Sequence, residues 1–111
     1  MIKNMLIRLF ILSSIFSCAA NAQQLTATII GSGSPIYNEN RASASVLISN
    51  GETNILVDMG NGTQANLHKL GFKVGDLSSL IFTHHHLDHN EEFVPIFIGC
   101  LMGRNDFTII G

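Results

Sequence analysis

The sequence is poor in charge and has no excess of basic residues. Only 13% of its 111 residues are charged, 46% are hydrophobic, and the formal net charge is −2. This composition excludes the charge-rich, apolar-poor pattern of a disordered chain. Because no positive field is available to attract nucleic acid, a nucleic-acid partner is not expected. The length leaves room for one small domain at most.

Proline and cysteine are equally scarce, with 2 residues of each. The 10 glycines, together with Asn and Ser, must therefore form most of the tight turns. Cys18 falls in an N-terminal segment that we expect to be removed, so Cys100 would be the only cysteine of the mature chain. That excludes an internal disulfide.

Long hydrophobic runs are also missing, because the apolar run at residues 9–16 is too short to cross a bilayer as a helix. Lys3 and Arg8 give a basic start, and the small-residue site Ala20-Asn21-Ala22 follows the run. These features predict a secretory signal peptide over residues 1–22.

Cleavage after Ala22 would leave residues 23–111 as the mature chain, exported to the periplasm or secreted, with no stable membrane anchor. Cys18 offers an alternative, because it could be the acylation site of a lipoprotein. The bulky Phe16 stands near it, where a small residue would fit better, so the lipoprotein interpretation is less favoured.

Strand-forming segments alternate with breaks rich in Gly, Asn and Ser. Strands are predicted at residues 25–30, 44–49, 54–58, 80–83 and 107–110. Asn50-Gly51 predicts a tight hairpin between the second and third strands. The last apolar strand leads into no further element, and we expect it to leave an open sheet edge and an uncovered face.

A short helix is predicted after these first strands. Thr63 can cap it, Leu67 and Leu70 would face inward, and Gly71 suits its C-terminal stop. Residues 74–77 are read as a turn or a short helical piece, and residues 90–101 as partly helical, with Pro95 in the first turns. Strands followed by a strand-helix-strand pattern predict a mixed α/β layer.

Residues 83–89, Thr-His-His-His-Leu-Asp-His, are the one stretch with clear chemistry. Neutral imidazoles and a carboxylate suit zinc, and they serve manganese and iron as well. His84 and His86 project to the same side of an extended backbone and can chelate one ion. Asp88 and His89 lie around the next bend and can reach a second ion. Two close metals can activate water and stabilise a developing oxyanion.

Two further histidines are not expected to bind metal. His85 points away from its neighbours on an extended backbone and is interpreted as a spacer. His68 falls in the predicted short helix, where a surface position is favoured.

The pattern His84-x-His86-x-Asp88-His89 resembles the H-x-H-x-D-H motif of the metallo-β-lactamase superfamily. Upstream glycine-containing segments resemble the opening of its ribonuclease Z-like branch, which includes zinc phosphodiesterases and arylsulfatase-like enzymes. These segments are residues 30–35, 40–42 and 58–64. The resemblance implies an α/β fold, the N-terminal half of an αββα sandwich, with a mixed sheet and flanking helices.

The resemblance also implies a role for each matching residue. His84 and His86 would be ligands of a first zinc ion, and Asp88 and His89 ligands of a second. Asp88 would in addition take part in proton transfer. Asp58 matches an aspartate at a strand end beneath the site, where it would orient a ligand histidine. The alternative for Asp58 is a helix-capping role.

Two departures from the family pattern stand out. The family completes its metal shell with a later His, a bridging Asp and a final His, and residues 23–111 are therefore expected to be a partial domain. Relatives have a small, Gly-containing turn after the motif, whereas this chain has Asn90-Glu91-Glu92-Phe93. The two carboxylates either adjust the charge at the mouth of the site or, as we prefer, are ordinary helix N-terminal acids.

The favoured function is a zinc-dependent hydrolase of small phosphodiesters or sulfate esters, acting through a metal-bound hydroxide. Export argues against tRNA processing, and the flanking motifs argue against β-lactam hydrolysis. The alternative is a catalytically inactive, truncated remnant that at most binds metal. Because the ligand set is incomplete, we expect the chain alone to be inactive.

Overall fold

The computed structural model describes residues 23–104 and 106–111, so the predicted signal peptide and Cys18 lie outside the described residues. The strands are β1 (Thr26–Gly31), β2 (Ser45–Ser49), β3 (Asn54–Val57), β4 (Ser79–Ile81) and β5 (Thr108–Ile110). The helices are α2 (Thr63–Lys69), the 3₁₀ turn η1 (Val74–Asp76), α3 (Leu87–Asn90) and α4 (Phe93–Gly103). Within these residues, no helix combines the length and apolarity needed to cross a membrane.

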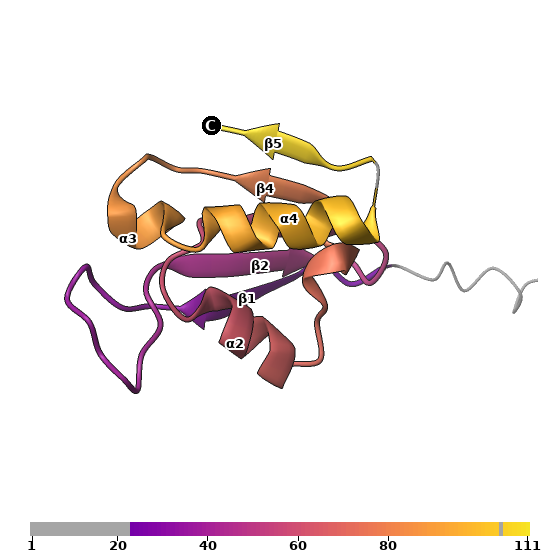
Figure 1. Ribbon diagram of the computed structural model, residues 1–111. Coiled ribbons are helices and arrows are strands. Elements are labelled where there is room, and N and C mark those ends of the chain that lie inside the picture. The colour runs from indigo at the N-terminus through magenta and orange to yellow at the C-terminus, as the bar shows by residue number, and fades with distance from the viewer. Residues whose placement is uncertain (1–22, 105) are drawn as a thin grey trace, which may run out of the picture.

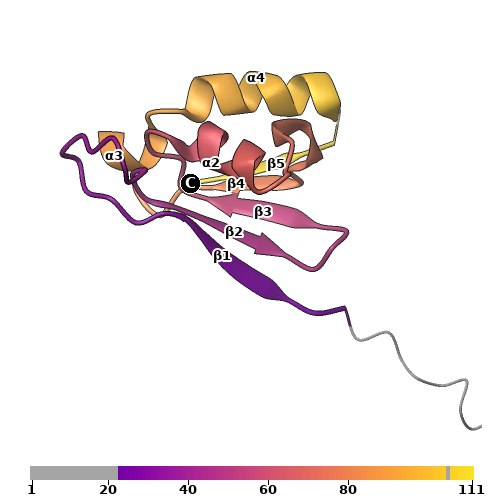
Figure 2. The same ribbon diagram turned by 90° about the horizontal axis from the view of Figure 1, so that it is seen from below.

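The five strands form one sheet in the order β1-β2-β3-β4-β5. The first three strands are antiparallel, and β4 and β5 then join in parallel. Figures 1 and 2 show α2 and α4 on one face of this sheet, and none of the described residues forms a helix on the other. The predicted mixed sheet with flanking helices is therefore confirmed.

The hairpin between β2 and β3 forms at the predicted Asn-Gly pair. Gly51 has a φ of 92°, a left-handed conformation that favours glycine. The side-chain oxygen of Asn50 accepts hydrogen bonds from the backbone N–H groups of Glu52 and Thr53, at 3.1 and 2.8 Å. The turn is closed locally, which sets the register in which Ser49 pairs with Asn54.

The core lies between the sheet and the helices. Leu47, Leu56 and Leu80 are paired across β2, β3 and β4, and all three are buried. Leu67 of α2 and Ile96 of α4 cover them from the helical side. The strands are thereby fixed to a helical layer, and the residues that follow β3 and β4 are held at one edge of the sheet.

The short helix α2 differs from its prediction in two details. Gly62, not Thr63, is its N-cap, and the Thr63 hydroxyl instead donates a 2.6 Å hydrogen bond to the carbonyl oxygen of Gly60. Leu70 follows the last helical residue and is 53% exposed, so it does not face inward as expected. Gly71, with a φ of 83°, does end the helix as predicted.

Candidate metal centre

The candidate centre lies where the parallel strands β3 and β4 end. Asp58 directly follows β3, and the His-rich segment begins two residues after β4. Because β3 and β4 run in parallel, both segments emerge at the same edge of the sheet. The backbone N–H of Asp58 donates a 2.8 Å hydrogen bond to the carbonyl oxygen of Ile81, which fixes the two strand ends together.

Asp58 is the buried hub of this edge, with only 5% of its surface exposed. Its Oδ1 accepts a hydrogen bond from the backbone N–H of Thr83 at 2.8 Å. Its Oδ2 contacts the Thr83 hydroxyl at 2.7 Å and Nδ1 of His89 at 2.8 Å. Asp58 is also the only non-glycine among the described residues with a positive φ, 58°. A backbone conformation of that kind, held by the surrounding structure, is common at functional sites.

The surroundings of Asp58 favour its charged form. Burial alone would raise the pKa of this carboxyl, but hydrogen bonds from His89 and Thr83 outweigh burial and hold the pKa below its ordinary value. The helix-capping alternative for Asp58 is wrong, because its carboxylate bonds to Thr83 and His89 and not to the start of α2, whose N-cap is Gly62. The carboxylate is instead hydrogen-bonded to His89, one of the predicted ligands.

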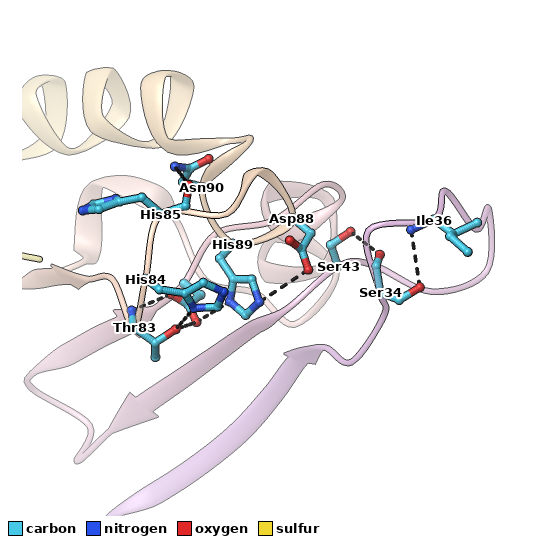
Figure 3. Close-up of polar contacts among 10 residues, drawn as sticks. Ser34, Ile36, Ser43, Thr83, His84, His85, Asp88, His89 and Asn90 are labelled. Carbon is cyan, nitrogen blue, oxygen red and sulfur yellow. Dashed lines mark hydrogen bonds and ion pairs between the residues drawn. The ribbon is translucent and has the colours of Figure 1, made fainter.

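The four predicted ligands gather in one cluster. The ring centroids of His84 and His86 are 4.5 Å apart, and those of His84 and His89 are 4.0 Å apart. Nε2 of His89 lies 3.4 Å from Oδ2 of Asp88. His84 and His86 are exposed, whereas the side chains of His89 and Asp88 are 20% and 12% exposed. Figure 3 shows the His84 and His89 rings side by side, with Asp88 turned toward His89.

The cluster fits a metal ion in the kind of its donors, and one pair fits in spacing. Two ligand atoms held at about 2.1 Å by one tetrahedral zinc ion would lie about 3.4 Å apart. Nε2 of His89 and Oδ2 of Asp88 are separated by that distance, 3.4 Å. Within residues 23–104 and 106–111, however, no three His, Cys, Asp or Glu side chains are arranged to hold one ion. The ligand roles of the four residues therefore stay predictions.

The two histidines that are not expected to bind metal lie outside this cluster. His85 packs on Phe82, with ring centroids 5.0 Å apart, and in Figure 3 it points away from His84 and His89. His68 is exposed on α2. Neither side chain joins the cluster.

Glu92 has a role that the sequence pattern did not specify. Its Oε1 accepts a hydrogen bond from the backbone N–H of Gly62 at 2.6 Å, and its Oε2 accepts one from Gln64 at 2.7 Å. It is thus a helix N-terminal acid, as preferred, but it serves α2 and not its own helix α4. Backbone hydrogen bonds also link the segment that leads into α2 to the segment that ends at Glu92. The Glu92 N–H donates to the carbonyl oxygen of Met59 at 3.0 Å, and the Met59 N–H donates to that of His89 at 2.7 Å.

Replacing Glu92 with alanine should destabilise the chain by about 1–2 kcal/mol, because two N–H groups at the start of α2 lose their acceptor. Glu91 is the matched control, since it carries the same charge next in the sequence and is exposed. Glu91→Ala should change stability by less than about 0.5 kcal/mol. Urea unfolding of both variants measures the difference, and equal losses would show that the two hydrogen bonds contribute nothing beyond charge.

Comparison with known proteins gives the family. Residues 25–92, more than half of the chain, match the family model described as anti-Pycsar protein Apyc1. The chain belongs to this family. The matched region starts at β1 and ends at Glu92, so it contains Asp58 and the whole His-rich segment.

Relatives of known structure or curated name agree with the wider resemblance. A ribonuclease Z of Mycobacterium avium (strain 104) is 40% identical over 74 residues, which is 67% of this chain and 26% of the relative. The metallo-β-lactamase fold protein YhfI from Bacillus subtilis is similar with a TM-score of 0.69 and 25% identity, covering 77% of this chain and 35% of that one. The short form of human tRNase Z is similar with a TM-score of 0.67 and 25% identity, covering 75% and 32%.

These matches confirm the metallo-β-lactamase superfamily, its ribonuclease Z-like branch and the predicted fold class. They also confirm that, at the level of the family, the chain is related to metal-dependent hydrolases. The chain spans about a quarter, 26%, of the length of the curated relatives it matches.

Proposed function

We propose that this chain carries part of the metal-binding machinery of a zinc-dependent hydrolase that cleaves small phosphodiesters or sulfate esters. The observation that carries the proposal is the cluster of three imidazoles and a carboxylate at the edge of the sheet, anchored by the Asp58 carboxylate. His84 and His86 would hold a first zinc ion, and Asp88 and His89 a second. When bound, the ions would supply a Lewis acid that activates water and offsets oxyanion charge.

The chain's own residues divide the remaining work. Asp58 accepts the hydrogen bond of His89 Nδ1 and so fixes the ring, leaving Nε2 for binding. Asp88 is mostly buried beside that ring, and its carboxylate can take up or release a proton during hydrolysis. The exposed side chains of His84 and His86 leave the centre open to a substrate.

The proposed substrate and compartment rest on the sequence. A signal peptide over residues 1–22 would send the protein to the periplasm or outside the cell, where tRNA precursors are absent, and the acidic composition offers no nucleic-acid surface. A small ester suits both conditions. One observation supports the alternative, a catalytically inactive remnant that at most binds metal. In the part of the chain that the structure describes, no three donor side chains are arranged to hold one ion.

The proposal is tested on the protein expressed from its natural gene. Zinc content and the hydrolysis of bis-p-nitrophenyl phosphate, p-nitrophenyl sulfate and nitrocefin are measured on the same samples. We expect zinc to be bound and at least one of the two esters to be cleaved. His89→Ala should lower the zinc affinity and the ester rate by at least about 10-fold. His68→Ala, which alters an exposed histidine outside the cluster, should leave both unchanged.

Each result points to a different conclusion. Zinc binding without any turnover would support the inactive remnant. Cleavage of nitrocefin with both esters left intact would overturn the proposed substrate class. Failure to bind zinc, or equal losses in His89→Ala and His68→Ala, would overturn the metal centre itself.

A further inference from the structure

The Thr83 hydroxyl lies between the Asp58 carboxylate and the His84 ring. Its oxygen is 2.7 Å from Oδ2 of Asp58 and 3.0 Å from Nδ1 of His84. We propose that Thr83 is a positioning residue that extends the influence of Asp58 to His84, so that one buried carboxylate sets the tautomer of two histidines. The proposal deepens the function proposed above and rests on it for its purpose, but not for its geometry.

Counting hydrogens decides the direction of each bond. The Thr83 hydroxyl has one hydrogen and two neighbours, and an ionised carboxylate can only accept. The hydrogen must therefore point to Asp58, because two oxygens 2.7 Å apart without a hydrogen between them would repel each other. The hydroxyl oxygen is then left to accept from His84, which places the His84 proton on Nδ1.

Asp58 sets the tautomer of His89 through a direct hydrogen bond. Its Nδ1 lies 2.8 Å from Oδ2 of Asp58, the oxygen that also takes the Thr83 hydrogen, so its Nδ1 must carry a proton. In the neutral form of each ring, Nε2 then holds the free lone pair. The two rings lie side by side, with centroids 4.0 Å apart. One carboxylate thus prepares two neighbouring imidazoles to bind through the same atom.

Further hydrogen bonds hold Thr83 against Asp58, although Thr83 itself is exposed. Asp58 also accepts a 2.8 Å hydrogen bond from the Thr83 backbone N–H, so the threonine is held by both its main chain and its side chain. The backbone of Asp58 is tied to Ile81 at the end of β4. A hydroxyl held in this way can fix the tautomer and the ring orientation of His84, as the hydrogen-bond partners of ligand histidines do.

The experiment determines histidine tautomers in the metal-free chain by ¹⁵N NMR at about pH 8.5, where ¹⁵N shifts also report whether each ring is neutral. In the natural sequence both His84 and His89 should show the Nδ1–H form. Thr83→Val keeps the side-chain shape without the hydroxyl, and it should shift His84 to a mixture of tautomers while His89 keeps the Nδ1–H form. Thr83→Ser restores the hydroxyl and should restore the His84 tautomer, which a loss of packing alone would not explain.

A Co²⁺ titration of the same three chains gives a second measurement. Thr83→Val should weaken Co²⁺ binding by about 10-fold or more, and Thr83→Ser should not. An unchanged His84 tautomer in Thr83→Val, or an altered one in Thr83→Ser, would overturn the relay. If the natural chain shows the expected tautomers but binds no Co²⁺, the relay stands and the proposed metal function fails.

Discussion

Replacing Asp58 with alanine is expected to lower the free energy of unfolding by about 3 kcal/mol. The carboxylate accepts from the backbone N–H of Thr83, from its hydroxyl and from the His89 ring, and all of these bonds would be lost at a buried position. Alanine would also have to adopt a φ of 58°, which is unfavourable for a residue with a Cβ. Urea unfolding of the variant measures the loss.

Two further variants separate the causes. Asp58→Gly removes the carboxylate but relieves the positive φ, so it should be less destabilising than alanine by about 1 kcal/mol. Asp58→Asn tolerates the positive φ and keeps one acceptor oxygen, so it should cost about 1–2 kcal/mol. A glycine variant as stable as the natural chain would show that the three hydrogen bonds do not stabilise the fold.

The pH dependence of the Asp58→Asn difference has a definite sign. The pKa of Asp58 is lowered in the folded chain, so its unfolded form binds a proton more readily than its folded form. The stabilisation is therefore fully present above the unfolded pKa of about 3.9 and is lost as the pH falls through the folded pKa. The difference between the natural chain and Asp58→Asn should be larger at pH 7 than at pH 3, and equal differences would contradict an ionised, hydrogen-bonded Asp58.

The strands and their order along the chain could be predicted because their signals are local. The strand predicted at residues 25–30 is observed as Thr26–Gly31, and the one at residues 44–49 as Ser45–Ser49. Both are β-branched segments that end at turn residues, and the Asn50-Gly51 turn carries its own geometry. The clustering of the four predicted ligands could be predicted in the same way, since they follow one another within a single bend of the chain.

Local patterns do not predict contacts between distant segments. The family resemblance implied that Asp58 orients a ligand histidine, but not that this histidine is His89 or that the Thr83 hydroxyl joins them. The hydroxyl of Thr83 and the ring of His89 meet Asp58 across 25 and 31 residues of sequence, and only the parallel pairing of β3 with β4 brings them together. For Glu92, the sequence indicated a helix N-terminus but not which helix, because its partner α2 begins about 30 residues earlier. Helical spacing predicts that Leu70 faces inward, but the helix ends at Lys69 and Leu70 is exposed.

Replacing Gly60 with alanine is the second change with a large expected effect, because it acts on the site without altering any polar group. A Cβ at this position would collide with the carbonyl oxygen of Asp88, and it would lie 2.5 Å from Cβ of Ser43. The Gly60 N–H also donates a hydrogen bond to the carbonyl oxygen of Ala44, next to β2, so Gly60 cannot move away from the sheet without losing this bond. The backbone at Asp88 must therefore move, and we expect the free energy of unfolding to fall by about 2 kcal/mol.

The displacement should reach the metal centre, since Asp88 and His89 lie on the backbone segment that Gly60 contacts. We expect Zn²⁺ affinity, measured by calorimetry, to fall by about 10-fold or more, because a misplaced ligand loses the spacing that one ion requires. Gly51→Ala is the matched control. It introduces a Cβ at a φ of 92° in open space, at the opposite end of β3 from Asp58, and should cost about 1 kcal/mol while leaving Zn²⁺ binding unchanged. If Gly60→Ala bound Zn²⁺ as tightly as Gly51→Ala, the close approach of Gly60 to Asp88 would not be what holds the second pair of ligands in place.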